Sequence, residues 1–298
     1  MRKRILLVCG MIFAASIFGS EPAEDFQSAM KLYNGGKFAE AEEAFSKLSV
    51  QNTSPRVADE GLAYAAYSAG QQKNIGKAME YAEKIKDKNL NMFCRMKLLE
   101  IQRKWGEIIS LSKDEDFDKW PEYMAYDAFF CRGNNYLRTK DAEKAEKDFL
   151  SAAKNTVEQE KKVAVYQSLG MLYGEVSKDE QKALNAYAEV IKIMTDPKPS
   201  PSGGYLLRAL MARAKILASQ GKSEEAFSEL GKLKSFDFKD PYWTCALQFS
   251  YGEVYEILGK NTEALESYRK AAAVANGPGY FVKVATQKIT DLEKKAQK

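Results

Sequence analysis

The sequence predicts an all-α protein, built as a solenoid of about seven helix-turn-helix repeats and closed by a C-terminal helix. Three observations predict this architecture. A small residue recurs at intervals close to the length of a helix pair, large apolar residues follow it at fixed helical offsets, and helix-breaking residues separate the periodic stretches. The 298 residues are 45% hydrophobic and 29% charged, which is the balance of a soluble globular protein.

Residues 1–20 have the features of a secretory signal peptide. Three basic residues at positions 2–4 precede an apolar run over 5–18, and Gly19 and Ser20 follow as small residues. The run is shorter than the roughly 20 apolar residues that a spanning helix needs. We therefore expect cleavage near residue 20, export to the periplasm or the exterior, and no membrane span in the mature chain. Retention of the segment as a membrane anchor is the alternative.

Residues 21–279 carry the repeats. The anchor of each repeat is a small residue, or once an isoleucine, in the middle of its expected second helix. The anchors are Ala41, Ala78, Ile108, Ala145, Ala183, Ala226 and Ala264, at intervals of 30 to 43 residues. Four residues after the anchor lie Phe45, Ala82, Phe149, Tyr187, Leu230 and Tyr268, and twelve before it lie Ala29, Gly133, Ala214 and Gly252. A loop one residue longer gives Gly170 and Tyr173 the same roles in the fifth repeat. A small residue on each helix allows close approach, and the large residue one turn later fills the groove.

The turns and helices together are similar to the tetratricopeptide repeat family. The segments that carry this resemblance begin at Gly36 (GKFAEAEEAF), Thr139 (TKDAEKAEKDF), Ser168 (SLGMLYGEVSKDEQKALNAY) and Tyr251 (YGEVYEILGKNTEALESY). The second and third repeats depart from the pattern. The resemblance implies a right-handed α-solenoid in which the first helix of each pair lines a concave inner face.

Two further segments punctuate the array. The stretch 196–204, DPKPSPSGG, contains three prolines and two glycines, so it predicts a long inter-repeat loop or a hinge. Residues 280–298 predict a capping helix, because Phe281, Ala285, Ile289 and Leu292 fall on one side of it.

The composition argues against catalysis and cofactor chemistry. The chain has no histidine, which removes imidazole bases and most zinc sites. Beyond Cys9 in the signal segment, Cys94, Cys131 and Cys245 lie far apart in apolar helical stretches, so we expect free, buried thiols. The alternating acidic residues in SKDEDFDK lack the glycine and glutamate of a calcium loop, and no phosphate-binding glycine loop occurs. We therefore expect no enzyme activity, no catalytic or metal-binding residues and no cofactor.

The remaining functional hypothesis is a scaffold in the cell envelope that binds a protein or peptide through its concave face, with no nucleic acid as a partner. Removing three of 45 basic residues, against 41 acidic ones, leaves a net charge of about +1, so no basic surface is indicated. The resemblance implies that the partner-binding residues of this concave face are Phe93, Lys97, Phe130, Asn134, Met171, Arg208, Met211, Lys215, Phe249 and Glu253. Two alternatives stay open: a structural solenoid that associates into a homo-oligomer, and a carbohydrate-binding or enzymatic module in the groove.

Overall fold

The computed structural model describes residues 20–51, 54–195, 204–235, 241–274, 277 and 279–296. These residues form α-helices joined by short turns, with no strand among them. The predicted signal segment, apart from Ser20, and the predicted hinge, apart from Gly204, lie outside the described residues. The chain divides into two compact units, which we treat separately: unit 1 ends at Asp116 and unit 2 begins at Phe117.

Unit 1 contains three helix pairs, which correspond to the first three predicted repeats. Its helices are α1 (Ser20–Asn34), α2 (Phe38–Gln51), α3 (Pro55–Gln71), α4 (Ile75–Lys84), α5 (Lys88–Ile101) and α6 (Trp105–Ser112). Each helix packs against the next one in the chain, and α3 also packs against α5. The second and third repeats therefore form regular pairs although their sequences depart from the pattern.

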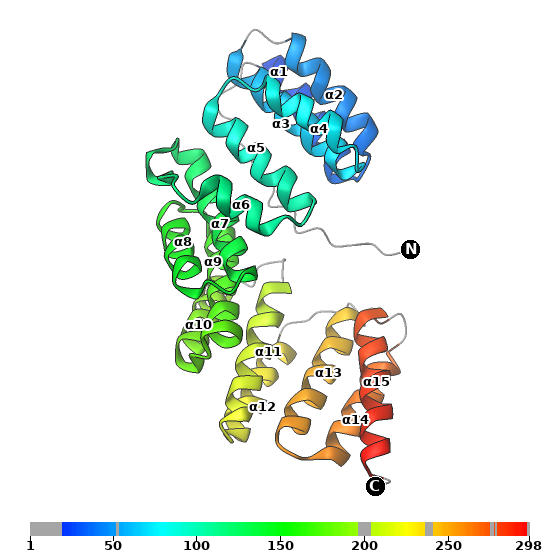
Figure 1. Cartoon of the computed structure of the whole chain (residues 1–298). Helices are drawn as coiled ribbons and strands as arrows, with labels where there is room; N and C mark the ends of the chain where they lie inside the picture. The colour runs from blue at the N-terminus through cyan, green and yellow to red at the C-terminus, as the bar shows by residue number, and fades with distance from the viewer. Residues whose placement is uncertain are drawn as a thin grey trace. The chain divides into compact units, whose positions relative to one another are not determined.

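Unit 2 contains the other four pairs and the closing helix (Figure 1). Its elements are the 3-10 turn η1 (Phe117–Lys119), α7 (Glu122–Arg138), α8 (Ala142–Lys154), α9 (Gln159–Met171), the π-helix η2 (Leu172–Ser177), α10 (Glu180–Thr195), α11 (Gly204–Ser219), α12 (Ser223–Gly231), the 3-10 turn η3 (Lys232–Ser235), α13 (Pro241–Ile257), α14 (Asn261–Ala272) and α15 (Gly279–Ala296). Helix α13 lies between α11 and α15 and contacts both.

The anchors lie where the sequence predicts them. All seven are on second helices, and each is 0% exposed. The predicted glycines of the first helices face aromatic rings of the second: a Cβ placed on Gly170 would lie 2.5 Å from the ring of Tyr187, and one on Gly252 would lie 2.6 Å from the ring of Tyr268. The close approach of the two helices is thus confirmed in these repeats.

Every repeat reverses direction through the same turn. The residue five before each anchor has a positive φ: Gly36, Lys73, Arg103, Lys140, Lys178, Gly221 and Gly259. The next residue donates its backbone N–H across the turn, as Asp141 does to the carbonyl of Tyr136 at 2.9 Å. This left-handed helix end satisfies carbonyls that would otherwise lack partners.

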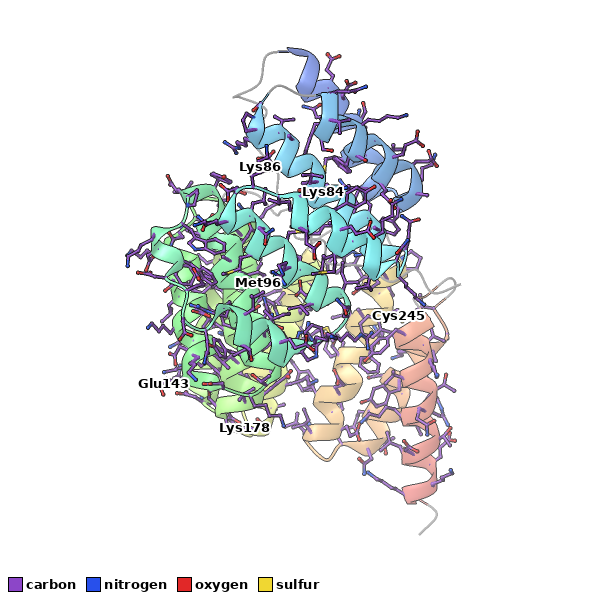
Figure 2. All side chains as sticks on the ribbon, turned by 45° about the horizontal axis from the view of Figure 1, so that its top comes forward. Lys84, Lys86, Met96, Glu143, Lys178 and Cys245 are labelled. Carbon is purple, nitrogen blue, oxygen red and sulfur yellow. The ribbon has the colours of Figure 1, made fainter. Side chains whose placement is uncertain are left out.

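The extra residue of the fifth repeat is not in a loop, so that prediction is wrong in its detail. Lys178 takes the same place in the turn as Lys140 does, and it is labelled in Figure 2. The additional residue is accommodated inside the first helix instead, where η2 continues α9 as a π-helix. A π-helix takes one more residue per hydrogen-bonded turn, so it absorbs an insertion without changing the turn that follows.

The closing helix α15 begins at Gly279, one residue before the predicted start. It packs against α14 and α13, with Phe281, Ala285 and Leu292 buried and Ile289 half-buried. Among the described residues, no helix is both long enough and apolar enough to cross a membrane.

Candidate functional site

The candidate site is the row of first helices in each unit. In unit 1, α3 packs against α5, and in unit 2, α11 packs against α9 and α13. Side chains of these helices that do not pack toward the second helices form what we call the first-helix surface. Because the two units are separate compact bodies, this surface is described within each of them.

Three of the ten predicted contact residues are buried, which corrects the prediction that they offer accessible contacts. Phe93, Phe130 and Phe249 are 3%, 8% and 5% exposed. The ring of Phe130 lies 5.9 Å from that of Phe149, and the ring of Phe249 lies 5.5 Å from that of Tyr268. All three phenylalanines stand fifteen residues before their anchors. That position faces the second helix of the same repeat, so these rings belong to the core.

The other seven predicted residues keep some exposure. Met171 is 37% exposed, Arg208 and Lys215 are exposed, and Lys97, Asn134, Met211 and Glu253 are half-buried. Two of these seven also serve the fold: the side-chain amide of Asn134 donates to the carbonyl of Phe130 at 2.8 Å, and Met211 packs against the core around Leu217 and Leu230.

In unit 1, three first helices bring polar side chains together. Tyr33 on α1 is 7% exposed and forms a side-chain hydrogen bond with Gln71 at the end of α3. Burial raises the pKa of the Tyr33 hydroxyl, while that hydrogen bond and the charge of Lys97 on α5 oppose the rise. Lys97 also forms an ion pair with Glu100 on its own helix. The sequence analysis did not select Gln71, although it lies beside the regular turn.

In unit 2 the first-helix surface carries a ladder of opposite charges. Lys215 on α11 donates to Glu253 on α13 at 2.9 Å. Glu256, one turn further along α13, accepts from Lys288 on α15 and from the hydroxyl of Tyr268, both at 2.8 Å. Burial pushes the pKa of the Glu256 carboxyl upward, but these two donors outweigh it and hold the pKa below its usual value. The charges of this ladder therefore neutralise one another between neighbouring helices.

The apolar pattern that predicts the closing helix assigns no role to Lys288. Its half-buried side chain instead completes the ladder, because α15 occupies the place beside α13 that the first helix of another repeat would take. A one-sided helical pattern could not show this, since the pairing depends on which residue of α13 lies opposite.

The three cysteines of the described residues belong to the core. Cys94, Cys131 and Cys245 are free and buried, as the sequence predicted. Burial raises the pKa of the Cys94 thiol to about 12, which keeps it protonated and unreactive at neutral pH. In the part of the chain that the structure describes, no group of three carboxylate or thiol side chains is placed to hold a metal ion.

Comparisons with known proteins support the fold. No family model and no curated protein sequence matches the chain. Among solved structures, it is similar to a tetratricopeptide repeat protein from Parabacteroides merdae, with a TM-score of 0.50 and 14% identity over 92% of this chain and 100% of that one. It is also similar to phAimR, with a TM-score of 0.45 and 16% identity over 90% and 76% of the two chains. For yeast Tom70 the TM-score is 0.45, with 13% identity over 96% and 67%. The fold is that of a tetratricopeptide repeat solenoid.

Proposed function

We propose that this chain is a non-catalytic scaffold that binds a protein or peptide segment along its first-helix surface. The observation that carries the proposal is a set of accessible side chains on successive first helices of unit 2. Met171 is an exposed apolar side chain and Met211 a half-buried one, and Arg208, Lys215 and Glu253 add charges of both signs on α11 and α13. Such a mixture suits a peptide with apolar side chains, because a flexible methionine repacks readily around different groups.

The charge pattern also argues for this partner class. A surface for a polyanion such as nucleic acid needs an excess of unopposed lysine and arginine. Here Lys215 and Lys288 are already paired with carboxylates on neighbouring helices. The ladder favours specificity over strong electrostatic attraction, since a partner must offer charges that match both signs.

Photocrosslinking in the native host tests the proposal. A photoreactive phenylalanine analogue at position 171 or 211 should form adducts of one discrete mass with a partner protein. The matched control is the same group at Lys147, which is exposed on the second helix α8. Adducts from position 147 alone would move the binding surface to the second helices, and adducts of twice the chain mass would establish self-association instead.

Export to the periplasm or the exterior is part of this proposal and rests on residues 1–20. The intact mass of the protein recovered from the native host checks it. We expect a chain that begins near residue 20 and fractionates away from membranes. Recovery of a membrane-bound chain that still carries Met1 would contradict export by cleavage.

A further inference from the structure

The fifth repeat differs from the other six at one defined place. Gly170 and the ring it faces, Tyr187, are seventeen residues apart, whereas Gly133 and Phe149 are sixteen apart, as are Gly252 and Tyr268. The glycine contact before the insertion and the turn after it both match those of the other repeats. The extra residue therefore lies between them, within the first helix.

The backbone hydrogen bonds of the turn locate the extra residue more closely. In the fourth repeat, Asp141 donates its backbone N–H to Tyr136, five residues earlier. In the fifth, Asp179 donates to Tyr173, six residues earlier, at 2.9 Å. The backbone N–H of Lys178 is directed at the same carbonyl. One additional residue thus lies between Tyr173 and Lys178, inside the π-helix η2.

The side chains of η2 show which part of it could move. Leu172 and Tyr173 are buried, and the Tyr173 hydroxyl donates to Glu146 on α8 at 2.8 Å. Glu175 and Ser177 are exposed and Val176 is half-buried, while a Cβ placed on Gly174 would lie 3.7 Å from the Cβ of the anchor Ala183, in ordinary van der Waals contact. The outer side of the segment 174–177 is therefore open to solvent through Glu175 and Ser177, while its inner side packs on α10.

We propose that the segment 174–177 is a conformational device, an opening element at the end of the first helix of the fifth repeat. A π-helical turn is rare because its hydrogen bonds are poorer than those of an α-helix, and proteins keep such turns mostly where a function needs them. The segment opens and closes while the contacts of Gly170 and the turn at Lys178 stay intact. It adjoins the exposed Met171, so the first-helix surface of unit 2 adjusts here. The proposal does not depend on the identity of any partner.

Amide hydrogen exchange of the full chain tests the opening directly. The amides of residues 174–177 should exchange at least about tenfold faster than those of 137–139, their counterparts in the fourth repeat, because local opening frees them without unfolding of the unit. Equal exchange at the two sites would overturn the proposal.

Three variants separate the extra backbone from the side chain that it carries. Deletion of Glu175 restores the residue count of the other repeats, and we expect it to slow exchange at the remaining amides to the level of 137–139 and to maintain or raise Tm. Glu175→Ala keeps the insertion, so exchange should stay fast. Deletion of Arg138, exposed at the corresponding place in α7, leaves the fourth repeat one residue short and should lower Tm sharply. A loss of Tm on deleting Glu175 as large as that on deleting Arg138 would show that the insertion is a required part of the packing and not an opening element.

Discussion

Single small residues decide how closely the two helices of a repeat approach. Gly133, Gly170 and Gly252 each face a ring that stands four residues after the anchor. The offsets predicted these contacts because both partners recur at fixed helical spacing. The same offsets misassigned the phenylalanines fifteen residues before the anchor. Phe26 and Phe45 show why, because their rings lie 5.3 Å apart and repeat the core pairing of Phe130 with Phe149.

Gly170→Ala should destabilise unit 2 by about 1–3 kcal/mol. The new methyl group would lie 2.5 Å from a carbon of the Tyr187 ring, which is itself 5% exposed and has no room to retreat. Denaturant unfolding followed by circular dichroism measures the change. The matched control is Gly76→Ala in α4, where a Cβ meets nothing within 4 Å and higher helix propensity adds up to about 1 kcal/mol. Equal effects of the two substitutions would show that the ring contact does not limit the approach of the helices.

The turns supply a second residue-scale prediction. Lys140 has a φ of 62° where Gly259 has 73°, so a lysine side chain occupies a conformation that glycine adopts freely. Lys140→Gly should stabilise the protein by about 0.5–1 kcal/mol, the relief of backbone strain less the extra entropy of glycine in the unfolded chain. Gly259→Lys should lower stability by a similar amount. Thermal unfolding of both variants checks the prediction, and a loss of stability in Lys140→Gly would contradict it.

The periodicity of the sequence predicted which helices form pairs. It did not reveal the contacts between pairs, because these depend on which helices are neighbours in space. The seven pairs followed from the anchors, and the one-sided pattern of α15 identified its apolar face. The Lys215–Glu253 and Lys288–Glu256 pairs were not predictable, because each joins helices whose relative rotation is set by packing. The π-helix was also missed, since the sequence shows that a residue is added and not which element absorbs it.

The Glu256–Lys288 pair makes the attachment of α15 dependent on pH. The pKa of Glu256 is lower in the folded chain than its usual value, so the folded state binds fewer protons around that value. Its stabilising effect is therefore present above the usual glutamate pKa and is lost as the pH falls through the lowered one. Glu256→Gln should destabilise unit 2 by about 1 kcal/mol at neutral pH, and the difference from wild type should vanish in acid.

Unfolding curves at neutral and acidic pH measure this difference. The matched control is Glu266→Gln, which breaks the exposed Glu266–Lys270 pair within α14 and should change stability less. A Glu256→Gln difference that persists unchanged at acidic pH would show that the carboxylate charge is not what attaches the closing helix.

At the scale of the whole molecule, the protein is a helical repeat solenoid, in which stability arises from contacts between neighbouring repeats. The sequence predicted the repeat number and the closing helix, because each is encoded locally. The sequence has its one composition break at 196–204, where a hinge was an alternative. The structure divides into two compact units elsewhere, after Asp116. That division follows the distribution of contacts along the chain, which composition does not reveal. The candidate surface was predicted as a set of positions, and burial then separated its accessible members from the core.

Calorimetry on the partner identified by crosslinking tests the central claim, that the first-helix surface binds this partner. Met171→Ala should weaken binding by about 1 kcal/mol or more, as expected for an accessible apolar contact. The double exchange Lys215→Glu with Glu253→Lys keeps the ion pair within the scaffold, so it should preserve Tm while reducing affinity for the partner. Lys147→Ala on α8 should bind as wild type does. Unchanged binding by the folded first-helix variants, together with weakened binding by Lys147→Ala, would contradict the account.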